Sequence, residues 1–171
     1  MVDEMITEAN IDNMPAGREM DALVCEKVMG HFVRHGGIFG LERLMPKYIG
    51  KELHTLSGYE SRHGNSYYVF ENGFDYAYGI VPYYSIDIRM AWEIEQEGWQ
   101  WDFLETSSRL HARVEIWIAK PRQINLHLER AYSADVYWKE FTTKQGAYAL
   151  ARCRVALKAV FQHENTRSES S

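Results

Sequence analysis

Strict alternation between apolar and other residues constrains the fold of this chain more than any other feature. From Leu110 to Ile118 every even position is apolar, and charged or aromatic residues stand between them. Successive side chains of a β-strand point to opposite faces, so a period of two predicts a long strand with one buried face. Pro121 ends this run, and the alternation returns at 124–128. Neighbouring strands joined by short turns predict a mostly antiparallel sheet.

Other segments supply the remaining elements. Asn72-Gly73 suits the positive backbone angles of a tight hairpin turn. Four further segments are expected to be strands: 67–70, 74–78, 99–104 and 135–142. Three segments have apolar residues at helical spacing: 15–29, 85–97 and 147–162. Three main helices and this sheet predict an α+β fold, arranged as an α-β-α sandwich.

The helix boundaries carry local signals. Pro15 suits a first helical turn, where no amide hydrogen is needed. Ser85 is expected to cap the second helix, and Asp87 favours the positive end of its dipole. In the last helix, Arg152, Arg154 and Lys158 are expected to lie away from the apolar face.

The length of 171 residues fits a single domain that folds without a disulfide or a metal. We expect a flexible N-terminus at 1–12, one domain at 13–163 and a disordered tail at 164–171. Glycines and a proline interrupt residues 31–66, which are expected to form an irregular insertion.

Charge and hydropathy narrow the set of partners. A formal net charge of −5 argues against nucleic acid and anionic lipid as partners. No apolar run approaches the ~20 residues that cross a bilayer, and Met1–Glu4 lacks the pattern of a signal peptide. We therefore expect a cytoplasmic protein with no membrane partner. Cys25 and Cys153 are expected to be buried free thiols, although a disulfide between them stays open.

Three blocks of sequence, taken together, point to a family. They are 13–30 (NMPAGREMDALVCEKVMG), 81–95 (VPYYSIDIRMAWEIE) and 149–159 (ALARCRVALKA). In this order they resemble the phage α-β-α (ABA) sandwich domain, a family of small phage and prophage proteins of unknown function. The resemblance implies a sandwich fold and a setting in the host cell cytoplasm. It implies no catalytic residues, and Ile86 stands where the family usually has Thr.

The start of the second helix holds the most suggestive cluster. Backbone amides at a helix N-terminus can hold a small anion, and tyrosines offer a stacking face. The alternative is ordinary helix capping. Arg18 has a similar ambiguity, because it either pairs with an acidic neighbour or reaches into a pocket. The residues predicted to bind a ligand are Arg18, Tyr67, Tyr68, Tyr83, Tyr84, Ser85 and Asp87.

No motif for catalysis stands out. The chain has no nucleophile elbow, no phosphate-binding loop and no dinucleotide fingerprint. His31 and His35 are four residues apart, but the glutamate of a zinc hydrolase does not lie between them. No catalytic residue, metal ligand or cofactor is therefore expected.

Two classes of function are carried forward. The first is a non-catalytic binding or interaction protein of a phage, which either sequesters a small nucleotide-like ligand or blocks a host defence protein. Its tyrosine-rich region also makes a homodimer an expected assembly. The alternative is a small nucleotide-modifying hydrolase that uses His54 or His63 with Glu60.

Overall fold

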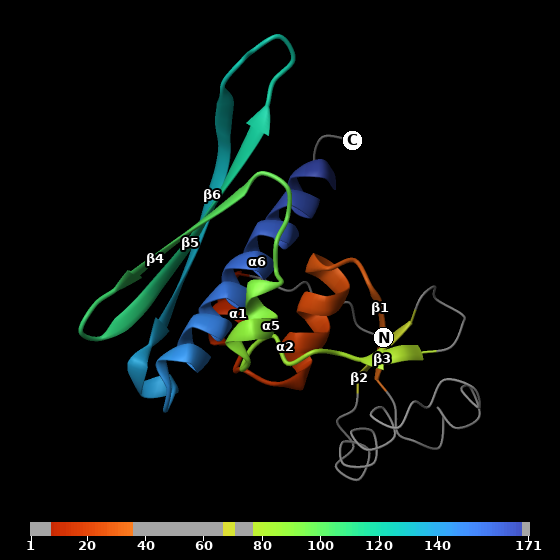
Figure 1. Ribbon diagram of the computed structural model, residues 1–171, viewed down its shortest axis with the longest axis vertical. Coiled ribbons are helices and arrows are strands. Elements are labelled where there is room, and N and C mark those ends of the chain that lie inside the picture. Colours follow the sequence, from red (N-terminus) through yellow and green to blue (C-terminus); the bar gives the residue numbers. More distant parts are fainter. Residues whose placement is uncertain (1–7, 36–66, 71–76, 169–171) are drawn as a thin grey trace. The chain divides into compact units, whose positions relative to one another are not determined.

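The computed structural model describes residues 8–35, 67–70 and 77–168 (Figure 1). The chain forms two compact units, one made of residues 1–16 and 84–171 and the other of residues 17–83. The domain expected at 13–163 therefore contains both boundaries between these units. Each unit holds a three-stranded antiparallel sheet and helices, which confirms the α+β fold.

The unit of residues 17–83 pairs a helical segment with a small sheet. The helix begins at Arg18, after Pro15, and its second half widens into a π-helical turn. Met20, Val24 and Cys25 are buried along it. The strand expected at 67–70 is confirmed, whereas Asn72-Gly73 lies outside the described residues. The elements are α2 (Arg18–Leu23), the π-helix η1 (Val24–Val28), β1 (Phe32–His35), β2 (Tyr67–Phe70) and β3 (Ala77–Ile80), with strand order β1-β2-β3.

The other unit contains a larger sheet with strand order β4-β5-β6. Its helices are α1 (Glu8–Asn13), α5 (Ile88–Trp92), the 3-10 helix η2 (Trp138–Glu140) and α6 (Lys144–Ser168). Its strands are β4 (Trp99–Glu105), β5 (Arg109–Ala119) and β6 (Leu126–Tyr137). No helix within the described ranges is long and apolar enough to cross a membrane.

The alternation of β5 builds the core of this unit. Leu110, Ala112 and Val114 pair with Val136, Ala134 and Tyr132 of β6, and all six side chains are buried on one face. Helix α6 packs against β5 and β6 (Figure 1). Each large apolar side chain removed from water here stabilises the fold by about 1.5–3 kcal/mol. The opposite face carries half-buried charged residues such as His111 and Arg113.

Helix α6 differs from the helix expected at 147–162. It begins at Lys144 and continues to Ser168, so residues 164–168 of the expected tail are helical. Arg152, Arg154 and Lys158, which were expected away from the apolar face, are also buried. The helix is covered on all sides over 149–159, because other elements surround it.

Three further expectations are corrected. Residues 8–12 are helical rather than flexible, because Ile11 is buried and α1 contacts α6. The helix expected at 85–97 spans only Ile88–Trp92. The strand expected at 135–142 is the end of β6, which stops at Tyr137 where the chain turns into η2.

Beyond β4, the strands β5 and β6 continue as a two-stranded ribbon. We call residues 117–128 the arm. A β-bulge between Ile116 and Trp117 marks its base, where the register shifts by one residue. The arm extends past the end of the sheet at Trp99 (Figure 1), and its turn contains Pro121.

Candidate ligand-binding site around Arg152

Arg152 lies in the middle of α6 with its side chain only 1% exposed. Its guanidinium carbon is 4.5 Å from the centre of the Trp92 ring on α5 and 4.0 Å from that of Trp101 on β4. The Nη2 atom donates to the backbone oxygen of Ile94 at 2.8 Å and to the carboxylate of Glu95. The cation is therefore held against two indole rings, one from α5 and one from β4.

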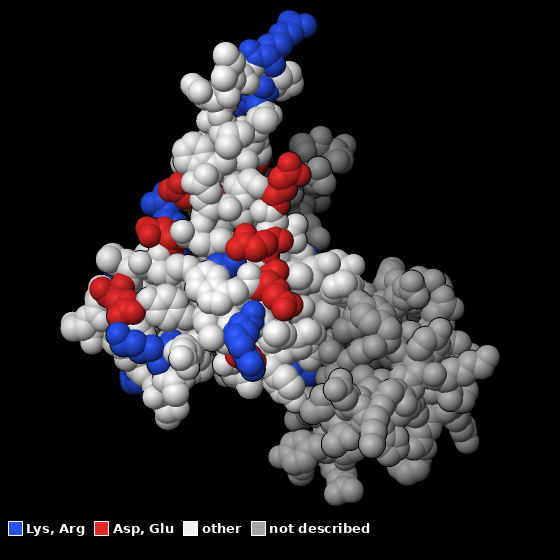
Figure 2. Space-filling model, viewed as in Figure 1, with Lys and Arg blue, Asp and Glu red and all other residues white. Residues whose placement is uncertain are grey.

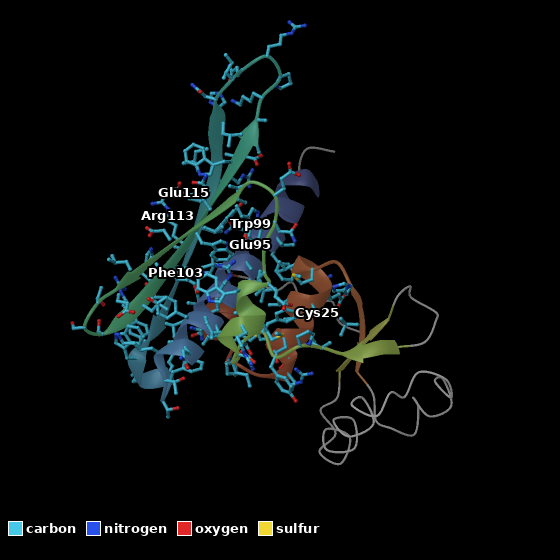
Figure 3. All side chains as sticks on the ribbon, in the orientation of Figure 1. Cys25, Glu95, Trp99, Phe103, Arg113 and Glu115 are labelled. Carbon is cyan, nitrogen blue, oxygen red and sulfur yellow. The ribbon has the colours of Figure 1, made fainter. Side chains whose placement is uncertain are left out.

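The period of two in β4 produces the aromatic part of this site. Trp99, Trp101 and Phe103 alternate with the polar Gln100 and Asp102. Trp101 and Phe103 pair with buried positions of β5, and Trp99 pairs with the partly exposed Ile116. Their rings form a row, with centroids 5.7 Å apart for the first pair and 6.2 Å for the second. Trp92 and Tyr148 approach Phe103 at 5.8 and 5.2 Å. We call these five residues the aromatic cluster; Figure 3 shows Trp99 and Phe103 along β4 and Glu95 beside Trp99.

Several buried donors in this site lack acceptors. Arg152 Nε and Nη1 and the Trp101 indole nitrogen have no hydrogen-bond partner within the described structure. An unsatisfied buried donor costs about 1–3 kcal/mol, and native proteins contain few of them. Burial lowers the pKa of Arg152, and the hydrogen bond to Glu95 opposes that shift; an arginine nevertheless stays protonated. The arrangement calls for an acceptor that the described residues do not provide.

One side of the site is open to solvent. Trp92 is 48% exposed, and the Glu95 side chain is 57% exposed. Acidic side chains gather where α5 leads into β4 (Figure 2), and Glu93, Glu95 and Glu97 of this segment are exposed. These carboxylates repel a strongly anionic ligand, whereas a neutral ligand with carbonyl oxygens avoids that cost.

A second candidate site lies at the free edge of β6. A cavity of about 460 Å³, which we call the edge pocket, is lined there by α1, β6, η2 and α6. Arg154 donates to the backbone oxygens of Met14 and Asp135 at 3.0 and 3.2 Å, and Lys158 donates to that of Ser133 at 2.9 Å. The two cations therefore occupy edge carbonyls that would otherwise be open to another strand.

The outer wall of the edge pocket is acidic. Asp12 accepts from Lys158 at 2.8 Å and Glu140 accepts from Arg154 at 3.2 Å. Asp135 accepts from Arg109 at 3.0 Å and lies 2.9 Å from His111 Nδ1. These three carboxylates are partly exposed, whereas Arg154 and Lys158 are almost completely buried. The open side of the edge pocket therefore offers carboxylate oxygens as acceptors to a ligand.

The sequence-predicted site residues are divided between the two units. Arg18 donates to Asp21 at 3.1 Å and to the backbone oxygens of Val81 and Pro82, and it lies 4.1 Å from the centre of the Tyr83 ring. It therefore pairs with an acidic neighbour, as one alternative expected. Tyr67 and Tyr68 lie in β2, and their side chains are outside the described part.

The remaining predicted residues, Tyr84, Ser85 and Asp87, lie in the unit of β4–β6. Tyr84 and Ser85 are buried. Asp87, not Ser85, caps α5, because its carboxylate accepts from the backbone nitrogen of Arg89 at 2.9 Å. The side-chain hydrogen bond from Arg89 also lowers the pKa of Asp87. Ser85 was the wrong cap because the helix begins three residues later than the sequence pattern predicts.

Sequence reasoning did not select the residues around Arg152. Two signals could have found them: a single arginine between Ala151 and Cys153 in an apolar run, and three aromatic residues at alternate positions from Trp99 to Phe103. Neither pattern shows that the two segments meet.

The cysteines and the candidate histidines remain to be placed in the structure. Cys25 and Cys153 are buried thiols that form no disulfide with each other, as expected. Over the described ranges, no three His, Cys, Asp or Glu side chains group as metal ligands. His54, His63 and Glu60 lie outside the described residues.

Comparison with family models, with curated proteins and with solved structures found no match to this chain. The resemblance to the ABA sandwich family therefore stays a prediction, and the site has to be interpreted from its own chemistry.

Proposed function

We propose that this protein is a non-catalytic binding protein of a phage, and that the aromatic cluster and Arg152 hold a small nucleotide-like ligand by its base. The observation that carries the proposal is the set of buried donors without acceptors on Arg152 and Trp101. A heteroaromatic base supplies carbonyl and ring-nitrogen acceptors together with a flat apolar face. Sequestering such a ligand requires recognition only.

Stacking gives the second part of the recognition. Trp92 is half-exposed and lies against the guanidinium, so it offers an open ring face at the mouth of the site. A base stacked on an aromatic side chain contributes about 1–3 kcal/mol. Tyr148 closes the far end of the cluster and is fixed by its hydrogen bond to Glu105 at 2.8 Å.

The Glu95 carboxylate controls whether a ligand can reach the guanidinium of Arg152. This carboxylate occupies one donor of Arg152, and most of the Glu95 side chain is exposed, so a ligand oxygen can replace it. The neighbouring Glu93 and Glu97 disfavour a phosphate group close to the base. Uncharged bases and nucleosides should therefore bind more tightly than nucleotides with several phosphates.

Titration with a series of bases, nucleosides and nucleotides, followed by tryptophan fluorescence and calorimetry, tests the proposal. Arg152→Met should weaken binding by about 10- to 100-fold, because hydrogen bonds from a charged donor contribute about 1.5–3 kcal/mol. Trp92→Ala should weaken it by a similar factor. Glu95→Gln should strengthen it, since a neutral amide competes less well for the guanidinium.

Trp138→Phe is the matched control, because Trp138 lies outside the aromatic cluster and donates to Thr106 at 2.8 Å. The Glu95 side chain is 57% exposed, so its carboxylate stays solvated when Arg152 is removed, and we expect Arg152→Met to fold. Unchanged binding by folded Arg152→Met and Trp92→Ala would refute the proposal.

The alternative, a small nucleotide-modifying hydrolase, has one supporting observation. His111 Nδ1 lies 2.9 Å from the Asp135 carboxylate across β5 and β6, a distance at which a carboxylate orients a general base. If this pair is catalytic, the protein should turn over a nucleotide, and His111→Ala should abolish turnover while leaving base binding at Arg152 intact.

A further inference from the structure

The groups at the Arg152 site that lack a partner are all hydrogen-bond donors. They are Arg152 Nε and Nη1 and the indole nitrogen of Trp101, none of which has an acceptor among the described residues. A guanidinium and an indole have no acceptor atoms. A ligand that meets them must therefore present acceptors, because an amino group in the same place would leave donors unpaired on both sides.

The guanidinium of Arg152 can make two parallel hydrogen bonds to one ligand. An arginine does this with Nη2 together with either Nη1 or Nε. In Arg152, Nη1 and Nε are unpartnered within the described part of the chain, and Nη2 is bonded to Ile94 and Glu95. The Glu95 side chain is 57% exposed, so a ligand can displace its carboxylate into solvent and complete the pair. The site therefore selects a ligand with two adjacent acceptors.

Among the bases of nucleosides, the 6-oxopurines guanine and hypoxanthine fit this requirement best. Their N7 and O6 are adjacent acceptors, and arginine contacts this edge of guanine with two hydrogen bonds. Adenine has N7 beside the N6 amino group, which places a donor against the guanidinium. In uracil a donor separates the two carbonyl oxygens. Cytosine has O2 next to N3, but its single ring offers less area to an indole than a purine does.

The acidic residues at the mouth of the site favour the same bases. Glu93, Glu95 and Glu97 are exposed in the segment between α5 and β4. In a 6-oxopurine the ring nitrogen next to O6 carries a hydrogen, which it donates to a carboxylate. The corresponding nitrogen of adenine is an acceptor, which a carboxylate leaves unpaired. The displaced Glu95 therefore finds a donor at this position of a 6-oxopurine and none at the same position of adenine.

We propose that the ligand of this site is a 6-oxopurine nucleoside. Its N7 and O6 accept from the guanidinium of Arg152, its N1–H donates to Glu95, and the purine stacks on the half-exposed ring of Trp92. This inference rests on the proposed function, since it names the base that the same site holds. It adds that the site discriminates between bases, which stacking by itself does not do.

Calorimetric titration with inosine and adenosine tests the inference most directly. The two nucleosides are similar in size and differ only at C6 and N1. Inosine should bind about 10-fold tighter or more, because a matched pair of hydrogen bonds from arginine discriminates between bases to that extent. 7-Deazaguanosine, in which a CH group replaces N7, should bind about 10-fold more weakly than guanosine, because one of the two hydrogen bonds is lost.

Two variants separate base selection from stacking. Arg152→Met should reduce the ratio of inosine to adenosine affinity to about one, because the discriminating donors are removed. Trp92→Ala is the matched comparison: it should weaken both nucleosides by similar factors and leave the ratio unchanged, since stacking tolerates any base. Adenosine or cytidine binding as tightly as inosine would overturn the inference and leave the proposed function standing. An absence of binding by every nucleoside would refute both.

An RNA strand presents the same base edge as a free nucleoside. Its phosphates, however, would approach Glu93 and Glu97, which repel them. A short guanine-containing RNA should therefore bind more weakly than guanosine. Tighter binding of the RNA would show that the ligand is not a free nucleoside and would overturn the proposal.

Discussion

At the residue scale, α6 buries three cations, and each is held by backbone oxygens as well as by a carboxylate. Arg152 donates to Ile94, Arg154 to Met14 and Asp135, and Lys158 to Ser133. Burying a charge is costly unless it is paired and hydrogen-bonded. Arg154 and Lys158 use this bonding to cover a strand edge. Among these three cations, only Arg152 has two nitrogens, and beside them an indole nitrogen, with no hydrogen-bond partner in the described part of the chain, and it lies against two aromatic rings.

Gly98 gives a prediction at the same scale. Its φ of +81° is disfavoured for other residues, and a Cβ there would lie 2.3 Å from the backbone oxygen of Trp117. Gly98→Ala should therefore destabilise the protein by about 2–4 kcal/mol, measured by denaturant unfolding, because backbone cannot move aside cheaply.

Gly30→Ala provides the comparison for that measurement. Gly30 has a similar φ of +72°, but an added Cβ would meet no described atom within 4 Å. Its substitution should cost only about 1 kcal/mol, the conformational penalty by itself. Equal losses for both variants would show that the contact with Trp117 is unimportant.

At the element scale, the end of β4 is tied to the start of α6. The Glu105 carboxylate accepts from Lys144 Nζ and from the Tyr148 hydroxyl, both at 2.8 Å. The hydrogen bonds from Lys144 and Tyr148 lower the pKa of Glu105, while burial and the bond to Glu105 raise the pKa of Tyr148. These contacts hold the last ring of the aromatic cluster in place.

The pH dependence of this link follows from the sign of the shift. A carboxyl whose folded-state pKa is lowered contributes stability that is present above its unfolded pKa and is lost as pH falls through the folded value. Acidification should therefore weaken the β4–α6 link. Carboxyl NMR titration should place the Glu105 pKa below its ordinary value, and Lys144→Ala should raise it.

Glu93 is a suitable internal reference for that titration, because it is exposed and lies outside the link. Lys144→Ala should leave its resonance unchanged. A Glu105 pKa that does not move in the variant would show that Lys144 is not its partner in solution.

At the scale of the whole molecule, the division into two compact units predicts two levels of cooperativity. Residues 17–83 interrupt a unit that is assembled from both ends of the chain. Local unfolding follows such compact units, each with its own free energy of opening. Amide exchange should therefore separate α2 and β1 from the strands β4–β6 and helix α6.

Leu150→Ala tests this separation. Leu150 is buried in α6, and its truncation should destabilise the surrounding unit by about 2–5 kcal/mol. Amide protection should fall in β4, β5, β6 and α6 and change much less in α2. An equal fall throughout the described residues would mean that the chain unfolds as one cooperative unit.

Elements with local signals could be predicted from the sequence. The alternation from Leu110 to Ile118 predicted β5 and its buried face, because the period of a strand is set by its own backbone. The apolar spacing at 15–29 likewise located a helical segment, and its π-helical turn was the main difference. The residues predicted to bind a ligand were chosen from short local segments. In the structure Asp87 caps α5, and Tyr84 and Ser85 are buried.

Features that depend on contacts between distant segments could not be predicted from the sequence. The sequence pattern only sets Arg152 apart from the apolar face of its helix; in the structure Trp92 of α5 and Trp101 of β4, both far earlier in the chain, lie against its guanidinium. The helix at 8–13 is stabilised by packing on α6, and an isolated helix of that length is unstable in water. The alternation at 124–128 predicted part of the arm. Its exposure to solvent could not be predicted, because it depends on where β4 stops pairing with β5. Such features depend on long-range contacts, for which a single sequence carries no local signal.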